Sequence, residues 1–158
     1  MRSISQPMLY ALSAAVLLLG AAQGAEAKPI CSRDLWRRTP EQTIREHIAL
    51  IQQGRIDEAM CDYAENATVI LPGQVVTGLD NIRIGLDGIG ALLGSGVPQI
   101  QTLTTHGPTV LLTFSAFGSP CTIPDGSDTY VVALGKIVVQ TVHDTFYSAP
   151  GAICPLAQ

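Results

Sequence analysis

The chain has 158 residues, of which 47% are hydrophobic and 14% are charged, and its formal net charge is −4. This composition predicts one globular domain and excludes a disordered tail, a coiled coil or a collagen-like fibre. Nine basic residues stand against thirteen acidic ones, and no basic run is longer than Arg37-Arg38. Because a phosphate backbone is held by clustered positive charge, nucleic acid is not an expected partner.

Residues 1–27 have the features of a secretory signal peptide. Arg2 supplies the positive start, an apolar stretch runs from Ala11 to Ala22, and Ala25-Glu26-Ala27 is a small-x-small cleavage site. The apolar stretch is shorter than the roughly twenty residues that a bilayer span needs. We therefore predict an exported protein, periplasmic or secreted, with no membrane span in the mature chain. A retained membrane anchor is the alternative.

All four cysteines follow the predicted signal peptide, and an even number in an exported chain predicts two disulfides. Three pairings are possible. We favour Cys31–Cys154, which would tie the two terminal tails together, with Cys61–Cys121 inside the domain. A catalytic cysteine is the less favoured interpretation, because no base lies nearby in sequence. No His, Asp, Glu or Cys cluster has ligand spacing, so we expect no metal and no cofactor.

Three segments have helical patterns. Thr39 is a hydroxyl N-cap followed by Pro40 at the first helical position, which predicts a helix that runs to Gln53. A shorter helix is expected over 56–63, and a third, weakened by internal glycines, over 79–93. One face of the first helix is formed by residues that recur three or four positions apart, namely Ile44, His47, Ile48 and Ile51.

The remaining segments are rich in β-branched residues and are bounded by turn residues. These predicted strands are 68–71, 74–77, 99–105, 109–117, 127–134 and 137–148. Helices followed by a run of strands predict an α+β domain, with the helices packed on one face of a curved sheet. We place an N-terminal arm at 28–39, the domain at 40–149 and a C-terminal tail at 150–158.

Several stretches resemble the nuclear-transport-factor-2-like (NTF2-like) or SnoaL-like superfamily over residues 40–148. They are the helix-Gly-helix opening at 51–57, the segments 63–72 and 78–82, and the final 135–138. The resemblance implies a curved mixed or antiparallel sheet wrapped around N-terminal helices, a cystatin-like cone with an internal pocket for a small apolar ligand. The superfamily includes ketosteroid isomerases, limonene epoxide hydrolases, scytalone dehydratases, polyketide cyclases and proteins without catalysis, so the fold alone predicts no reaction.

Two mechanisms of the superfamily lack their charged residues in this sequence. The aspartate base of ketosteroid isomerases would stand at Leu71, which cannot take a proton. The arginine and one aspartate of limonene epoxide hydrolases would fall within 112–116, which is Leu-Thr-Phe-Ser-Ala. Neither mechanism is therefore predicted in its known form.

The last predicted strand still carries an acid on its inward face, where Gln140, Val142, Asp144 and Phe146 alternate with outward residues. By resemblance, Asp144 matches an acid–base aspartate of cyclases and hydrolases, and His47 matches the position of the ketosteroid isomerase tyrosine. Burial would raise the pKa of Asp144 towards neutrality. We hypothesise that Asp144 and His47 form a proton-transfer pair at the pocket floor. The other predicted pocket residues are Tyr63 as a possible hydrogen-bond donor to substrate, Leu71, Leu112, Phe114, Val142 and Phe146.

Three interpretations of the chain stay open. In the first, the chain is a cofactor-free enzyme of isomerase, lyase, cyclase or epoxide-hydrolase style that acts on an apolar oxygenated substrate. In the second, Asp144 only caps a backbone amide or ties down His47, and the pocket binds a ligand without chemistry. In the third, the chain is a dimerisation module, because the outer sheet face carries apolar residues that could pair with a second copy, namely Leu111, Phe117, Val139 and Thr141. A homodimer is also compatible with either of the other two.

Overall fold

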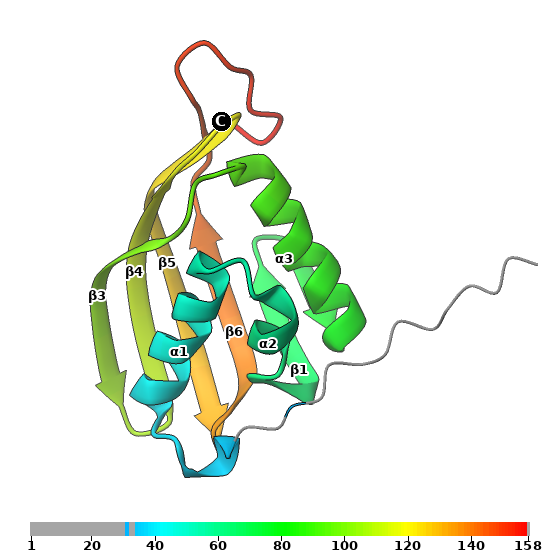
Figure 1. Ribbon diagram of the computed structural model, residues 1–158, viewed down its shortest axis with the longest axis vertical. Helices are drawn as coiled ribbons and strands as arrows, with labels where there is room; N and C mark the ends of the chain where they lie inside the picture. Colours follow the sequence, from blue (N-terminus) through cyan, green and yellow to red (C-terminus); the bar gives the residue numbers. More distant parts are fainter. Residues whose placement is uncertain (1–30, 32–33, 158) are drawn as a thin grey trace, which may run out of the picture.

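A curved seven-stranded sheet and three α-helices form the described part of the chain (Figure 1). The structure is a computed structural model that describes Cys31 and residues 34–157, so the predicted signal peptide lies outside the described residues. After a 3₁₀ turn at Leu35–Arg37, the helices are α1 (Pro40–Gln52), α2 (Ile56–Met60) and α3 (Leu79–Leu93). The strands are β1 (Tyr63–Leu71), β2 (Gln74–Thr77), β3 (Gln99–His106), β4 (Thr109–Phe117), β5 (Cys121–Ala133), β6 (Lys136–Asp144) and β7 (Tyr147–Ser148).

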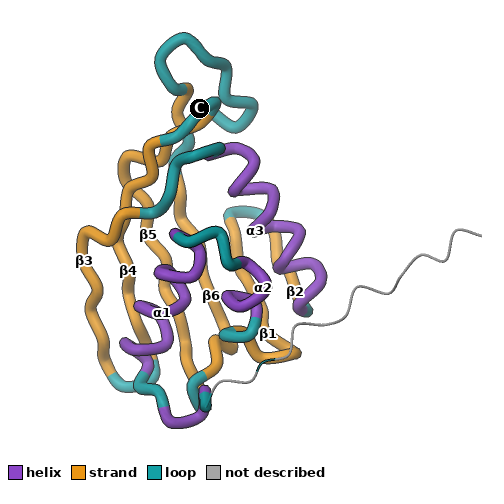
Figure 2. The backbone as a smooth tube through the Cα atoms, viewed as in Figure 1, coloured by secondary structure: helices purple, strands orange, loops and turns teal. Residues whose placement is uncertain are grey.

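The sheet is mixed, as predicted. Its strand order is β2-β1-β6-β5-β4-β3, all neighbours are antiparallel except β1 and β6, and the short β7 pairs with the start of β5. Figure 2 shows the helices on one side of this sheet. There α1 packs against β4 and β5, whereas α3 packs against β1 and β2. None of the described helices has the length and apolar character that crossing a bilayer requires.

Local sequence signals position the first helix as predicted. The side chain of Thr39 accepts a hydrogen bond from the backbone N–H of Gln42, the Gln42 side chain accepts from the N–H of Thr39, and Pro40 begins the helix. The buried face of α1 includes Ile44, Ile48 and, fully buried between them, His47. The helix therefore presents an imidazole to the concave side of the sheet.

Three strand boundaries differ from the prediction, and irregular pairing hides two of them in the sequence. The second helix ends at Met60, and Tyr63 already belongs to β1, whose pairing with β6 shifts between Tyr63 and Thr68. Residues 124–126 are not a turn but lie within β5, where the pairing with β4 gains one extra residue. The β-bulge at this point accommodates Pro124, which has no N–H to donate and which a regular strand would therefore exclude. The last predicted strand is interrupted, since β6 ends at Asp144 and β7 starts at Tyr147.

The disulfides join different cysteines from those that we favoured. The structure pairs Cys31 with Cys61 and Cys121 with Cys154, so both predicted bridges are wrong. The N-terminal arm packs on the turn between β5 and β6, where a Cβ on Gly135 would overlap the backbone oxygen of Leu35. The C-terminal tail instead leaves β7 at the opposite end of the sheet (Figure 1). The two tails lie at opposite ends, and each is tied to the strand or helix end beside it.

The outer face of the sheet leaves apolar side chains at the surface. Leu111 and Phe117 are exposed, Val139 is half-buried and Thr141 is exposed. These residues form the surface that we expect to pair in a homodimer. The dimer itself stays a prediction.

Peptide mapping of the oxidised protein without reduction should find Cys31 linked to Cys61 and Cys121 linked to Cys154. The C121A/C154A variant should lose roughly 3–4 kcal/mol of unfolding free energy, because the bridge closes a loop of 33 residues. Denaturant titration measures this loss. Peptides that join Cys31 to Cys154 would contradict the observed pairing.

Candidate active site

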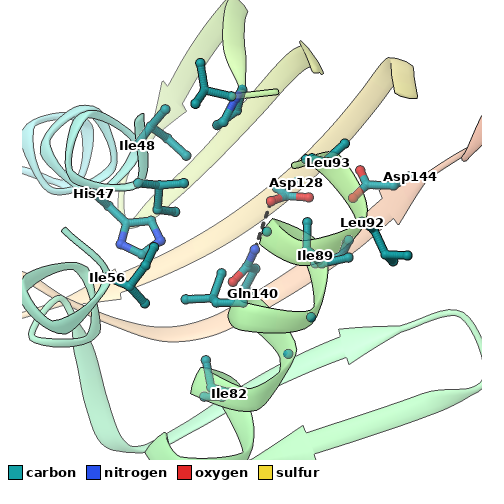
Figure 3. Close-up of a pocket in the computed structure, with 18 of the residues that line it drawn as sticks. His47, Ile48, Ile56, Ile82, Ile89, Leu92, Leu93, Asp128, Gln140 and Asp144 are labelled. Atoms are coloured by element: carbon teal, nitrogen blue, oxygen red, sulfur yellow. Dashed lines mark hydrogen bonds between the residues drawn. The ribbon is translucent and has the colours of Figure 1, made fainter. Parts of the chain in front are cut away.

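A pocket of about 920 Å³ lies between the helices and the concave face of the sheet (Figure 3). This volume is in the range of small-molecule sites. Most of its wall is apolar and comes from α1, α3 and the sheet, with Ile48, Ile51, Val69, Ile82, Ile89 and Phe114 among the lining residues. The described lining residues include no lysine or arginine.

The part of the pocket wall that α3 supplies includes three glycines. Gly85, Gly88 and Gly90 of α3 all line the pocket. A Cβ placed on any of the three would meet no heavy atom within 4 Å outside the chain neighbours and the helix's own backbone. The glycines that weaken α3 as a helix therefore leave open space beside the pocket.

Most of the predicted site residues line this pocket. His47, Tyr63, Leu71, Phe114, Val142 and Asp144 all do. Leu112 and Phe146 do not belong to the lining. Leu112 is fully buried in the hydrophobic core, and Phe146 lies in the unpaired segment between β6 and β7, where the strand alternation no longer applies.

The polar side chains of the pocket floor lie within three rows of residues that cross β4, β5 and β6. The pairing registers define these rows as Val110–Tyr130–Gln140, Leu112–Asp128–Val142 and Phe114–Gly126–Asp144. Asp128 and Asp144 thus occupy diagonal positions on neighbouring strands, about 7–8 Å apart at the backbone. The alternation of β6 predicted Asp144 correctly as an inward residue, but Asp128 was not among the predicted site residues.

Asp128 is held by one of its two carboxyl oxygens. Its Oδ2 accepts hydrogen bonds from the hydroxyl of Tyr130 at 2.8 Å and from Nε2 of Gln140 at 2.8 Å. Oδ1 is buried and has no hydrogen-bond partner among the described residues. Burial raises the pKa of Asp128 to about 6, although the hydrogen bonds from Tyr130 and Gln140 and the charge of His47 act in the opposite direction.

Asp144 rests in a space that a glycine leaves open. A Cβ on Gly126 would lie 2.8 Å from Oδ1 of Asp144 and 2.7 Å from the ring of Phe114. Oδ1 of Asp144 is buried and also lacks a hydrogen-bond partner among the described residues. Burial, and then the charge of Asp128, raise the pKa of Asp144 to about 7.

Tyr63 and Gln140 complete the floor. The Tyr63 hydroxyl donates its hydrogen to Oε1 of Gln140, and this orients the amide so that its Nε2 faces Asp128. Burial raises the pKa of Tyr63 well above its ordinary value, so the phenol stays protonated. The hydrogen that we expected Tyr63 to offer to a substrate is already used inside the protein.

His47 has a different acidic partner from the one that we expected. Its Nδ1 lies 3.4 Å from Oδ2 of Asp62, a fully buried carboxylate just before β1. Its ring meets that of Tyr63 edge-on at a centroid distance of 5.1 Å. The structure brings His47 and Asp144 to the same pocket but does not pair them.

Comparison with solved structures supports the resemblance, whereas no protein-family model and no curated protein matches the chain. An NTF2-like protein of unknown function from Cytophaga hutchinsonii has a TM-score of 0.58 at 18% identity, over 67% of this chain and 89% of that one. An uncharacterised cystatin-fold protein from Novosphingobium aromaticivorans has a TM-score of 0.59 at 18% identity, over 67% and 98%. The chain has the NTF2-like fold. The predicted cystatin-like cone is thereby confirmed.

A third similar structure is that of SalBIII, an epoxide hydrolase/cyclase-like enzyme with a role in pyran ring formation in the polyether salinomycin. It has a TM-score of 0.61 at 17% identity, over 70% of this chain and 95% of that one. At this identity the likeness shows the fold and not the reaction.

The buried carboxyl of Asp144 should make stability depend on pH. Between about pH 4 and pH 7 the folded state keeps a proton on Asp144 that the unfolded state, with an ordinary pKa of 3.8, has lost. Unfolding free energy should therefore fall as pH rises through this window and level off above it. D144N should be more stable than the wild type at pH 8.5, on the order of 1–2 kcal/mol after allowance for partial exposure, and similar to it at pH 4.

Thermal melts from pH 4 to pH 8.5 measure this effect. Asp125 lies on the same strand as Gly126 but is exposed, so D125N is the matched control and should keep the wild-type pH dependence. A D144N variant that destabilises as steeply as the wild type between pH 6 and pH 8 would show that this carboxyl is not the titrating group.

Proposed function

We propose that the protein binds a small, neutral, mostly apolar molecule that carries oxygen atoms, and moves protons on it without a cofactor. The observation that carries this proposal is the pair of diagonal carboxyls, Asp128 and Asp144, each with one buried oxygen that lacks a hydrogen-bond partner among the described residues. The absence of lysine and arginine from the described lining disfavours an anionic substrate. The apolar walls favour a hydrocarbon body.

The two carboxyls are suited to opposite tasks. Like charges in a dry site resist joint ionisation, so near neutral pH the pair holds about one proton. Asp144, with a pKa of about 7, is the better proton donor in this pair, and Asp128, with a pKa of about 6, is the better acceptor. Such a pair can act as general acid and general base on one substrate.

Opening of an epoxide by a hydroxyl group fits this pair. Asp144 gives its proton to the epoxide oxygen as the carbon–oxygen bond breaks, while Asp128 takes the proton of the attacking hydroxyl as the new carbon–oxygen bond forms. The product is an isomer of a hydroxy-epoxide when the hydroxyl is internal, and a diol when it comes from water. The fold shared with SalBIII, an epoxide hydrolase/cyclase-like enzyme, supports this reaction class.

The place of action that we propose is outside the cytoplasm. Two disulfides join all four cysteines, and such bridges persist in oxidising compartments. The predicted signal peptide at 1–27 agrees with export. Secretion and the homodimer both remain part of this proposal.

Incubation of the purified protein with a panel of apolar epoxides and hydroxy-epoxides tests the activity, with products separated by gas chromatography and mass spectrometry. We expect D144N and D128N each to lower turnover by roughly 10²–10⁴-fold, the usual contribution of a general acid or base. The pH–rate profile should be bell-shaped, with limbs near pH 6 and pH 7. The exposed D125N variant should turn over like the wild type.

Two outcomes would contradict the proposal. Wild-type turnover by D144N would remove this carboxyl from the chemistry. Calorimetric binding of panel members without any conversion would instead identify a ligand-binding protein, the second interpretation of the sequence.

A further inference from the structure

A chain of buried polar groups runs from the N-terminal arm to the pocket, and the proposed proton transfer between carboxyls does not use it. It begins at Arg38, between the 3₁₀ turn and α1. Nη2 of Arg38 donates a hydrogen bond to Oδ1 of Asp62 at 2.7 Å. The other oxygen of Asp62, Oδ2, lies 3.4 Å from Nδ1 of His47, which lines the pocket.

Arg38 is fixed on three sides. Besides Asp62, its guanidinium donates to Oε2 of Glu46 at 2.8 Å and to the backbone oxygen of Gly135 at 2.9 Å. The side chain of Arg38 is nearly buried, at 12% exposure. A guanidinium held by α1, by the turn between β5 and β6 and by Asp62 cannot easily leave the carboxylate that it supports.

Asp62 is kept ionised by these neighbours. Its side chain has no exposed surface, and burial alone would raise its pKa. The neighbouring His47 and Arg38 reverse this effect and bring the pKa of Asp62 below its ordinary value. An ionised carboxylate only accepts hydrogen bonds, so the imidazole nitrogen that faces it is favoured to carry hydrogen.

The second ring nitrogen of His47, Nε2, belongs to a side chain that lines the pocket. Nε2 is buried and has no hydrogen-bond partner among the described residues. Figure 3 shows the ring extending from α1 towards the space in front of Gln140 and Asp128. The rings of Tyr63 and Tyr130 lie against the imidazole, with centroids at 5.1 and 6.3 Å, and restrict its rotation. The groups that face His47 are thus Asp62 on one side and Asp128, Tyr63 and Tyr130 on the other.

We propose that Asp62, held by Arg38, is a positioning residue that keeps a hydrogen on Nδ1 of His47, so that Nε2 is the atom that exchanges a proton inside the pocket. At 3.4 Å the contact is long for a hydrogen bond, as contacts in ligand-free active sites often are. The chemical use of Nε2 rests on the proposed function, but the state of the ring does not. His47 then acts on a ligand oxygen at the α1 side of the pocket, opposite the wall that carries Asp144.

Nitrogen-15 NMR of the ligand-free protein tests the proposal without a substrate. The chain has three histidines, and the exposed His106 and His143 serve as internal references, while H47Q identifies the His47 signals. In the wild type we expect neutral His47 to show a protonated Nδ1 and an unprotonated Nε2. In D62N this preference should be lost, with neutral His47 moving to the form protonated on Nε2, because an amide can also donate to Nδ1.

E46Q is the matched control. It removes the charge of a second Arg38 partner without altering the carboxylate that faces His47, so the wild-type ring state should persist. A wild-type His47 whose neutral form carries its hydrogen on Nε2 would overturn the proposal, and this measurement does not require D62N to fold. An unchanged ring state in folded D62N would overturn it as well. Neither result bears on the epoxide assay of D128N and D144N, so the two proposals can fail separately.

Discussion

The cost of burying a carboxyl group beneath a curved sheet governs the arrangement of this pocket. Three aspartates lie in or beside the pocket, and each has different neighbours. Asp62 has a guanidinium and an imidazole beside it and stays ionised. Asp128 has two neutral hydrogen-bond donors on one oxygen, whereas Asp144 lies beside a glycine and its buried oxygen has no hydrogen-bond partner among the described residues. The result is a series of increasing pKa values, from Asp62 to Asp128 to Asp144.

The sheet supplies the spacing that this series needs. Side chains two residues apart on one strand lie on the same face about 7 Å apart, and paired residues on adjacent strands lie closer. Asp128 and Asp144 belong to neighbouring rows on neighbouring strands, which is near enough for the charge of Asp128 to raise the pKa of Asp144. Gly126 separates Asp144 from Phe114 along their row, so the acid and the aromatic ring share the space of a missing side chain.

Sequence periodicity predicted the parts of the site that depend on one element. The inward position of His47 follows from the repeat of α1, and that of Asp144 follows from the alternation of β6. Asp128 has the same alternation, since it points inward together with Tyr130 and Val132 on a predicted strand. Alternation alone, however, does not distinguish an aspartate of the site from one that faces solvent at a strand end. Its relation to Asp144 depends on the β5–β6 register, which an irregularity between Val131 and Val132 shifts by one residue.

Other features have no local pattern at all. Asp62 stands between a helix and a strand, where neither period applies, and its partners Arg38 and His47 come from elsewhere in the chain. The cysteine pairing depends on which end of the sheet each tail reaches, so counting cysteines predicted two bridges but not their partners. The start of β1 was missed for a related reason, because its first residues pair irregularly with β6.

The glycines of α3 affect the shape of the pocket but not the ionisable groups on its floor. The ionisable and hydrogen-bonded groups of the floor belong to α1, the sheet or the junction before β1, whereas Gly85, Gly88 and Gly90 contribute no side chain to the facing wall. Each glycine weakens the helix by about 1 kcal/mol relative to alanine. A methyl or larger side chain at any of them would stabilise α3 and narrow the pocket. Such variants would accept fewer ligands, while every ionisable group of the site stays in place.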